Sequence, residues 1–451
     1  MKVSRLLLIL ICICFVHLAK GQYYFFGGLG MDQGKSIIVC ANQDLMLLGS
    51  TSSDVEQAAN VYLMRVDTNM QCIWSLSLGG HGIEQAISIV ETEEEEFLIL
   101  GNTSDSDNNG YDIALWKVDA EGEILWQTQY GDEQWNFANR LIKGNANDYW
   151  ITGYTINIDD GTKDPLLLHL SEVGEELQYL SYVTESDDDF VDLDILDNGT
   201  ILLSGNTCTS EDVCTSWIKI LDNSGALLDF NTFGNDDLST IVTETILHGQ
   251  YIVHCGHTVQ NGIPSSYLRR LNSDGTLNWE QIEAYSQEET YLSVIEYGGH
   301  YYIATESYVS STGDTDGIIY RRNEGGWYQD AHIIQTNLNT GFFDLVFHPN
   351  GDLFAIGYYT TVQQDIAFLI YKHNSTTLVN DLNLAIIPTA CFTVGLEEFE
   401  TIKSIDSTQF YNWMGQKLDA TKLPACYIRI DYFTDGTIAT QKICGVAVEG
   451  D

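Results

Sequence analysis

Short apolar runs that end in glycine recur along the chain at a nearly constant spacing. The runs are Leu45–Gly49, Phe97–Gly101, Tyr149–Gly153, Ile201–Gly205, Tyr251–Gly256, Tyr301–Thr305 and Leu353–Gly357. Their last residues are separated by 52, 52, 52, 51, 49 and 52 positions, and only in the sixth run does threonine replace the glycine. Seven copies at such a period indicate a repeat architecture in which each copy forms one supersecondary unit.

The second repeat shows what one unit contains. Gln85–Val90 predicts a first strand, and the charged segment after it predicts a turn into the glycine-ended strand. Ile113–Val118 predicts a third strand, and the turn Asp119–Gly122 leads to a fourth, Glu123–Thr128. Glycine in that turn supplies the positive φ of a tight hairpin. Four short antiparallel strands repeated seven times predict an all-β, seven-bladed β-propeller, because a closed ring hides the sheet edges that a flat array exposes.

The two ends of the repeat region predict how the ring closes. The seventh repeat has only a weak fourth strand, near Thr376–Val379. At the other end of the chain, Tyr23–Gly28 resembles the end of a repeat such as Gln129–Gly131. We therefore predict that Tyr23–Phe26 supplies or supplements the outer strand of the last blade and clasps it to the first.

The first 21 residues have the pattern of a secretory signal peptide. Lys2 and Arg5 precede the apolar run Leu6–Leu18, and a small-x-small site at residues 19–21 predicts cleavage before Gln22. The apolar run is too short to span a bilayer, and no other segment is long enough. We therefore expect an exported protein without a transmembrane segment, extracellular or on the outer-membrane surface, with the periplasm as the alternative.

The best-formed repeat resembles the blades of propellers that are common in secreted proteins of the Bacteroidota. Those blades carry a glycine, then Lys-x-Asp, then Gly-x-x-x-Trp, which correspond here to Gly101, Lys117, Asp119, Gly122 and Trp126. The resemblance implies an exported repeat protein and agrees with the predicted leader.

The repeat pattern stops after Leu384. The order Gly415–Lys417, Leu423–Ile430 and Thr440–Ile443 resembles the type A C-terminal sorting domain of type IX secretion substrates. The resemblance implies a small β-sandwich and export by the type IX machinery. The Pro-Asn-Pro opening of that family is reduced to residues 387–389, and its glycine before the tyrosine strand has no counterpart. A small β domain retained on the propeller is therefore the alternative.

These observations divide the chain into three parts. Residues 1–21 are the predicted signal peptide, residues 22–383 the propeller, and residues 384–451 the C-terminal β-sandwich, which is sorting-domain-like.

Acidic residues outnumber basic ones by 64 to 20, which gives a formal charge of −44. Such a surface repels nucleic acid and anionic membranes and favours cations, basic partners or neutral ligands such as glycans. Solubility alone is the simpler explanation of the charge.

In an up-and-down blade, the loops between blades share a face with the loops between second and third strands. Both sets are acidic, so we expect one acidic face around the channel mouth that binds a protein or glycan ligand. The acidic residues of these loops are Glu84, Asp105, Asp107, Asp112, Asp132, Glu133, Asp159, Asp160, Asp164, Asp187, Asp188, Asp189, Asp236, Asp237, Glu288, Glu289, Asp314 and Asp316.

One acidic loop has the beginning of a calcium-binding pattern. Asp105, Asp107, Asn109 and Asp112 offer alternating side-chain oxygens around a glycine, as calcium loops do. The glutamate that such loops carry at the twelfth position is replaced by Trp116. The loop is therefore either a calcium site, with calcium as the one candidate cofactor, or a polar hairpin loop.

Removal of the leader leaves eight cysteines, and an exported chain favours disulfides. Cys208 and Cys214 would close a short loop and form the best candidate pair, and a pair among Cys391, Cys426 and Cys444 is a second candidate.

Few other residues suggest chemistry. His254 and His257 are three apart in a strand and so point to opposite faces, which argues against a shared metal. Trp135 and Tyr291 are candidates for exposed aromatic residues that stack on sugars, although core packing explains most of the aromatic residues.

Three functions remain open at this point. No metalloprotease, serine-hydrolase or phosphate-loop motif occurs, which favours a non-catalytic binding or scaffold propeller. A structural subunit of an outer-membrane complex that retains the C-terminal domain is the second reading. A carbohydrate-active enzyme is the third, and clustered carboxylates with raised pKa values in a deep central pocket would support it.

The intact mass of the native protein from envelope and medium fractions tests the division of the chain. We expect loss of residues 1–21 and of a C-terminal piece that begins near Leu384. A mass that runs from Gln22 to Asp451 would exclude cleavable sorting and favour a retained C-terminal domain.

Overall fold

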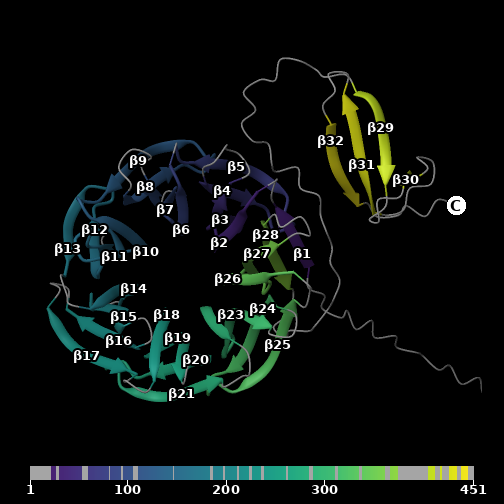
Figure 1. Ribbon diagram of the computed structural model, residues 1–451. Coiled ribbons are helices and arrows are strands. Elements are labelled where there is room, and N and C mark those ends of the chain that lie inside the picture. The colour runs from purple at the N-terminus through teal and green to yellow at the C-terminus, as the bar shows by residue number, and fades with distance from the viewer. Residues whose placement is uncertain are drawn as a thin grey trace, which may run out of the picture.

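The computed structural model describes most of the chain between residues 22 and 373 and four short C-terminal segments (Figure 1). The described residues are 22–26, 30–52, 59–80, 82–92, 95–104, 110–145, 147–182, 186–196, 199–210, 213–222, 226–234, 238–260, 263–283, 288–309, 313–334, 338–360, 366–373, 405–411, 417–418, 426–433 and 438–444. Residues 22–373 form a ring of seven four-stranded antiparallel sheets, which confirms the predicted seven-bladed β-propeller.

The strands of the first four blades run from the inner to the outer edge in chain order. Blade 1 is β2 (Asp32–Val39), β3 (Leu45–Thr51), β4 (Asn60–Val66) and β5 (Cys72–Leu78). Blade 2 is β6 (Glu84–Glu91), β7 (Phe97–Ser104), β8 (Tyr111–Val118) and β9 (Ile124–Tyr130). Blade 3 is β10 (Trp135–Lys143), β11 (Tyr149–Ile156), β12 (Lys163–Leu170) and β13 (Glu176–Ser181). Blade 4 is β14 (Asp187–Ile195), β15 (Ile201–Ser210), β16 (Val213–Leu221) and β17 (Leu227–Phe233).

The remaining blades follow the same order except at the closure. Blade 5 is β18 (Ser239–His248), β19 (Tyr251–Gln260), β20 (Ile263–Leu271) and β21 (Leu277–Glu283). Blade 6 is β22 (Glu289–Tyr297), β23 (His300–Val309), β24 (Asp314–Asn323) and β25 (Tyr328–Ile334). Blade 7 is β26 (Thr340–Phe347), β27 (Leu353–Thr360), β28 (Ile366–His373) and β1 (Gln22–Phe26), the most N-terminal strand.

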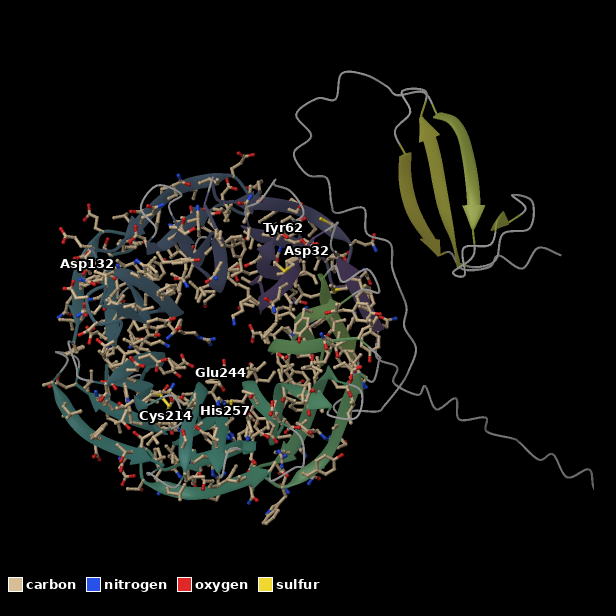
Figure 2. All side chains as sticks on the ribbon, in the orientation of Figure 1. Asp32, Tyr62, Asp132, Cys214, Glu244 and His257 are labelled. Carbon is tan, nitrogen blue, oxygen red and sulfur yellow. A yellow bond between two sulfur atoms is a disulfide. The ribbon has the colours of Figure 1, made fainter. Side chains whose placement is uncertain are left out.

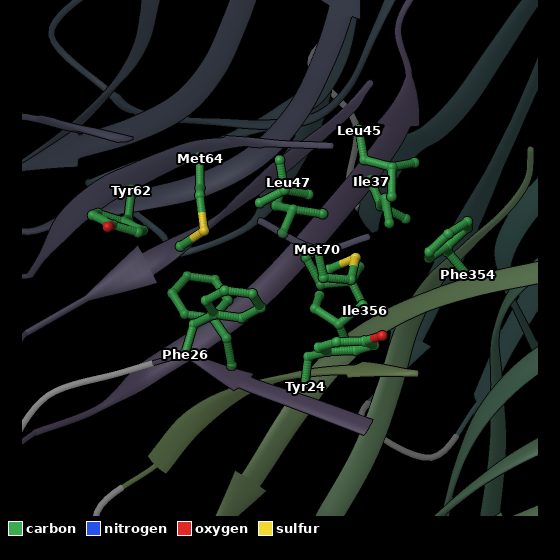
Figure 3. Close-up of a cluster of buried hydrophobic side chains, with 13 residues drawn as sticks. Tyr24, Phe26, Ile37, Leu45, Leu47, Tyr62, Met64, Met70, Phe354 and Ile356 are labelled. Atoms are coloured by element: carbon green, nitrogen blue, oxygen red, sulfur yellow. The ribbon is translucent and has the colours of Figure 1, made fainter. Parts of the chain in front are cut away.

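The ring closes through β1, as the sequence predicted. This strand pairs antiparallel with β28 from Gln22 opposite Lys372 to Phe26 opposite Phe368. Tyr24 and Phe26 belong to a buried cluster that also contains side chains of blades 1 and 7 (Figure 3). The N-terminal strand therefore joins the last blade by hydrogen bonds and the first blade by apolar packing. The weak strand predicted near residues 376–379 lies outside the described residues.

Position in the blade explains the hydrophobic pattern. The middle strands lie between two neighbouring blades, so both of their faces are covered, and every residue of β4 is buried. The outer strands lie at the circumference, and every residue of β13 is exposed or half-buried. The continuous apolar runs that define the repeat are thus the second strands, whose two faces both pack in the core.

The recurring Gly-x-x-x-Trp turn is a contact between blades. Trp74, on the outer strand of blade 1, lies against Gly122 in the last hairpin of blade 2, and Trp126 lies against Gly174 of blade 3. A Cβ atom on Gly122 would come within 2.9 Å of the Trp74 ring, and the glycine has a positive φ of 88°. The Trp74 indole also donates a hydrogen bond of 2.9 Å to the carbonyl of Ala120. Glycine is therefore required both for the turn and for the neighbouring ring.

The described C-terminal segments form one further antiparallel sheet. Its strands are β29 (Ile405–Tyr411), β30 (Lys417–Leu418), β31 (Cys426–Phe433) and β32 (Ile438–Cys444), in the order β30-β29-β31-β32. Cys426 lies opposite Cys444 in its register. The other residues of the predicted sandwich, including Cys391, and the predicted signal peptide lie outside the described residues. Within the described part of the chain, no helix is long and apolar enough to cross a bilayer.

Ring closure can be tested at β1. Truncation of the buried ring in Phe26→Ala should destabilise the protein by about 3–5 kcal/mol, the usual cost of removing a buried phenylalanine. Phe25→Ala is the matched control, because Phe25 is only half-buried on the opposite side of the same strand. Urea and thermal unfolding measure both variants. Equal losses for the two, or no loss for Phe26→Ala, would contradict the clasp.

Candidate functional site

Every inner strand carries a β-bulge at the same position. The register with the second strand shifts by one residue in all seven blades, as between Ala138 and Arg140 in blade 3. The residues inserted by these bulges are Lys35, Ile87, Asn139, Val191, Thr243, Leu292 and Phe343. A bulge re-aims the local side chains, and here it does so where the inner strands line the central channel.

In six of the seven blades, a glycine inside the second strand makes room for this bulge. A Cβ atom on Gly153 would lie 1.9 Å from the carbonyl oxygen of Phe137, just before the bulge of the same blade. The corresponding distances are 2.0 Å from Gly256 to the carbonyl of Ile241 and 1.9 Å from Gly357 to that of Gly341. In blade 6 the threonine at this place, Thr305, donates a hydroxyl hydrogen bond to the corresponding carbonyl instead. The sequence repeat therefore follows from a close backbone approach.

Side chains of neighbouring blades satisfy the backbone groups at the bulges. The N–H of Ala138 donates to Oδ1 of Asn102 at 2.8 Å, and the N–H of Val242 donates to Oδ1 of Asn206 at 2.8 Å. In both cases the asparagine directly follows the repeat glycine in the second strand of the preceding blade. A buried N–H without a partner is costly, so these two bonds fix the inner strands of blades 3 and 5 to the blade before.

The residue after each bulge forms a ring around the channel, which we call the waist ring. Its members are Ser36, Ser88, Arg140, Asp192, Glu244, Ser293 and Asp344. Each of its three carboxylates accepts a backbone hydrogen bond from the next blade around the ring. The donors are Thr245 to Asp192 at 3.1 Å, Val294 to Glu244 at 2.5 Å, and Ile37 to Asp344 at 3.0 Å. These carboxylates are thus part of the contacts between blades.

Arg140 connects neighbouring members of the waist ring. Its Nε lies 3.6 Å from Oδ1 of Asp192, and its Nη1 lies 3.3 Å from Oε1 of Glu244, so it connects blades 3, 4 and 5. Its side chain stays 38% exposed, and Figure 2 shows Glu244 at the inner edge of the ring. Arg140, Glu244 and Asp344 line both of the cavities into which the channel is divided, with volumes of about 290 and 430 Å³.

Burial dominates the acid–base properties of the waist ring. Desolvation raises the pKa of Glu244 to about 7, although the neighbouring Arg140 opposes this shift. Burial also raises the pKa values of Asp192 and Asp344, again opposed by Arg140. The pKa of Arg140 is itself raised, chiefly by the charge of Asp192. The positive charge of Arg140 therefore favours the ionised form of several carboxyl groups, which would otherwise be more strongly protonated at neutral pH.

The cavity of about 290 Å³ opens toward the face that carries the loops between blades. We call it the channel-mouth cavity, and the first halves of the inner strands line it, including Lys35, Asn139, Arg140, Asp189 and Phe343. The Lys35 ammonium lies 5.1 Å from the centre of the Phe343 ring and makes no ion pair within the described residues. The Lys35 side chain is exposed in this cavity, while desolvation by the surrounding strands lowers its pKa and Asp344 opposes this effect. The cavity thus combines donors, acceptors and one half-buried aromatic ring.

Acidic side chains are not confined to this face. Asp132, Glu133, Asp159, Asp160, Asp187 and Glu288 are exposed on it. The turns of the opposite face expose Glu95, Glu121, Glu123, Glu172, Glu175 and Asp274. The expectation of one acidic face is therefore wrong for the described residues, because both faces carry exposed carboxylates.

Several acidic residues predicted to lie on the surface are buried in the blades. They are Glu84, Asp164, Glu289, Asp314 and Asp316. Glu289 shows the physical reason, because the hydroxyls of Ser266 and Tyr320 donate to it at 2.6 and 2.8 Å. Asp105, Asp107, Asp236 and Asp237 lie outside the described residues.

The candidate metal-binding residues are not brought together in the part of the chain that the structure describes. Asp105, Asp107 and Asn109 lie outside that part, while Asp112 is in β8 opposite Thr103. No group of three metal-ligating side chains occurs among the described residues. The calcium hypothesis therefore stays a prediction.

Cys208 and Cys214 lie opposite each other on β15 and β16 and are joined by a disulfide.

The two histidines of β19 lie in different surroundings. His254 is fully buried beside Arg269, and His257 lies at the edge of a cavity between blades 5 and 6.

The two aromatic candidates differ in their exposure. Trp135 is partly exposed and meets Tyr111 edge to face. Tyr291 is fully buried, and its hydroxyl accepts a hydrogen bond of 2.6 Å from Arg322. Tyr291 is therefore a core residue, and its predicted role in sugar stacking is wrong.

Sequence reasoning missed the residues that line the channel. The signal was nevertheless present, because each waist-ring residue precedes the last residue of its repeat run by 13 positions, or by 12 in blades 5 and 6. Arg140, for example, stands 13 positions before Gly153. An alignment of the seven repeats on that residue would have placed one arginine and three acids in a single ring.

The fold of the described residues defines the class of this chain, a seven-bladed β-propeller. No protein-family model matches the chain, and no characterised protein sequence does. The polysaccharide lyase Uly1 is similar at a TM-score of 0.48 and 10% identity, over 76% of this chain and 90% of that one. The endosialidase of phage phi92 is similar at 0.45 and 9%, over 96% and 80%. A subtype N10 neuraminidase-like protein of A/little yellow-shouldered bat/Guatemala is similar at 0.41 and 10%, over 63% and 93%. At these TM-scores and sequence identities, the similarity carries no argument about the function of this chain.

Glu244 gives the site a testable pH dependence. A carboxyl whose pKa is raised on folding favours the folded state at low pH, and this contribution is lost as the pH rises through the folded value of about 7. Relative to Glu244→Gln, the wild type should therefore lose stability between pH 5 and pH 9, at about 1.4 kcal/mol per unit of pKa shift. Urea unfolding at both pH values measures the difference.

The control for this comparison is Glu123→Gln, which changes an exposed carboxylate in an outer turn. The control should show a nearly constant difference from wild type. If the wild type instead gained stability over Glu244→Gln at high pH, the attraction of Arg140 would outweigh the cost of burial, and the account of the site would be wrong.

Proposed function

We propose that this propeller is an exported, non-catalytic binding protein that takes a neutral, hydroxyl-rich ligand such as a glycan unit in its channel-mouth cavity. The observation that carries the proposal is that Lys35, Asn139, Arg140 and Asp189 line one cavity together with the half-buried ring of Phe343, which the Lys35 ammonium approaches to 5.1 Å. A sugar presents hydroxyl groups on its edge and C–H groups on its faces. Donors and acceptors around an aromatic ring match both parts of such a ligand.

The charges of the cavity favour a neutral ligand. Two cations, Lys35 and Arg140, face the same space as Asp189, Asp192, Glu244 and Asp344. An anionic ligand would meet these carboxylates, and a small cation would meet the guanidinium and the ammonium. A hydroxyl group both donates and accepts, so it can bond to either kind of group, and charged partners strengthen such bonds. A volume of about 290 Å³ is near the lower end for ligand pockets and suits one sugar-sized unit.

Binding without catalysis follows from the bonds that the carboxylates already make. Asp344 accepts hydrogen bonds from the hydroxyl of Ser36 and the backbone N–H of Ile37, each at 3.0 Å. Glu244 is held by Val294 and Arg140. Carboxylates fixed in the contacts between blades are poorly placed to move toward a substrate.

A carbohydrate-active enzyme is the second candidate, and the raised pKa of Glu244 favours it. A carboxyl that titrates near pH 7 beside a cavity has the property of a general acid. Incubation with polysaccharides distinguishes the two functions. New reducing ends or unsaturated products that are lost in Glu244→Gln would establish an enzyme, whereas intact polysaccharide together with measurable binding supports a binding protein.

Export is part of the proposal and rests on the leader pattern and on the resemblance of the C-terminal segment to type IX sorting domains. If the sorting domain is removed, the propeller acts in the medium or on the cell surface. If it is retained, the segment is free to dock on an outer-membrane partner, and the protein is then a subunit of an envelope complex. A protein ligand in place of a glycan remains the alternative for the binding face.

Isothermal titration calorimetry of the full chain against a panel of neutral, amino and acidic monosaccharides and their methyl glycosides tests the site. We expect saturable binding of a neutral sugar that Lys35→Met and Phe343→Ala each weaken by at least about tenfold, the effect of losing roughly 1.4 kcal/mol. Lys143→Met is the matched control, because Lys143 lines the opposite half of the channel. The absence of saturable binding, or an equal loss in the control, would contradict the proposal.

A further inference from the structure

A second polar cavity lies on the same face, at the seam between blades 5 and 6. It has a volume of about 420 Å³, and we call it the seam cavity. His257 and Pro264 line it from blade 5, and Glu306, Tyr308 and Thr315 line it from blade 6. The loop between the two blades contributes Glu288. No residue of the waist ring belongs to this cavity, so it is chemically distinct from the channel.

The seam cavity and the channel-mouth cavity share a wall. Leu292, the residue inserted by the bulge of blade 6, lines both cavities. Thr290 lines the seam cavity two residues before it, and Ser293 lines the channel-mouth cavity one residue after it. The first part of β22 therefore passes from one cavity to the other, and the two form neighbouring compartments on one face.

His257 points to an occupant of the seam cavity. Its Nδ1 atom is shielded from solvent and has no hydrogen-bond partner among the described residues. Burial lowers the pKa of His257, so the ring is neutral at neutral pH and one of its nitrogens can accept a hydrogen bond. His257 thus lines the cavity with hydrogen-bonding capacity that its neighbours leave unused, and a hydroxyl group, which both donates and accepts, can pair with it.

The other lining groups fit a ligand that carries hydroxyl groups. Glu306 accepts a hydrogen bond of 2.9 Å from the hydroxyl of Tyr358, and the hydroxyl of Thr315 lies 3.1 Å from the same Tyr358 oxygen. Tyr308 is 39% exposed and offers a ring face for stacking. Glu288 is exposed, so together with Glu306 it makes the cavity unfavourable for an anionic chain.

We propose that the channel-mouth and seam cavities form one extended site for a neutral, linear oligosaccharide, with one sugar unit at Lys35 and Phe343 and a further unit at His257 and Tyr308. This inference rests on the proposed function and adds the length and the charge of the ligand. Leu292 lies under the link between the two units. The site therefore selects ligands by their chain length, because the chain runs outward from the channel to the seam between blades 5 and 6.

Calorimetry of the full chain with oligomers of one to six units tests this inference. The probes are linear neutral glucans and N-acetylglucosamine chains, with galacturonic acid oligomers as the anionic comparison. We expect neutral oligomers to bind at least about tenfold more tightly than their monomer, and the gain to level off once both cavities are filled. Acidic oligomers of the same length should bind more weakly than neutral ones.

Two variants assign this gain to the seam cavity. Tyr308→Ala and His257→Leu should reduce oligomer affinity to that of the monomer and leave monomer affinity unchanged, because the monomer occupies only the channel mouth. His257→Gln keeps a hydrogen-bond acceptor and should retain part of the gain. Tyr328→Ala removes a similarly exposed tyrosine from the outer strand of blade 6 and should change neither affinity.

The outcomes separate this inference from the function on which it rests. Monomer binding without a gain from longer chains, or a gain that survives Tyr308→Ala, overturns the extended site and leaves the channel-mouth site intact. If no sugar of any length binds, the proposed function and the inference both fail. Thermal unfolding of each variant establishes that a lost gain does not come from a lost fold.

Discussion

The bulge in the inner strand is the constraint on which this propeller depends. It requires a backbone approach so close that a glycine lies opposite it in the second strand of six of the seven blades, with Thr305 bonding to the corresponding carbonyl in the other. Its displaced backbone groups bond to the blade before, as Ala138 does with Asn102. In three blades the residue after it is a carboxylate that bonds to the next blade, as Asp192 does with Thr245. One local irregularity, repeated seven times, therefore sets the sequence period, connects the blades and determines which residues line the channel.

This arrangement separates structural from functional positions along the same strand. Among the waist-ring carboxylates, Asp192 and Glu244 are buried and Asp344 is half-buried. All three bond between blades, so a change in one of them affects the contact between two blades. The residues inserted by the bulges vary more in chemistry, from Ile87 and Val191 to Lys35 and Phe343. Two of them also bond to the next blade: Asn139 donates to the carbonyl of Phe190 at 2.8 Å and Thr243 to that of Tyr291 at 2.6 Å. Such positions can change their chemistry without loss of the ring. A ligand site formed by the inserted residues is consistent with this freedom, since binding residues are commonly carried on a rigid scaffold.

Much of the fold could be predicted from the sequence because the repeat is strong. Apolar strands, turn glycines and the similarity of Tyr23–Phe26 to the end of a repeat were sufficient for the blades and their closure. The channel was not predicted, because a bulge changes the alternation of side chains without leaving a motif of its own. Glu289 and Tyr291 were both placed on the surface by loop and residue type, whereas both are buried by partners from β20 and β24 that are distant in sequence. Long-range hydrogen bonds of this kind have no local sequence signal.

The most direct test of the account is a crystal structure of the full chain with the tightest-binding neutral saccharide. The account predicts ligand density in the channel-mouth cavity, in contact with Lys35 and Asp189 and with a sugar face on Phe343. Density on the outer strands or on the opposite face, with the channel mouth empty, would contradict it.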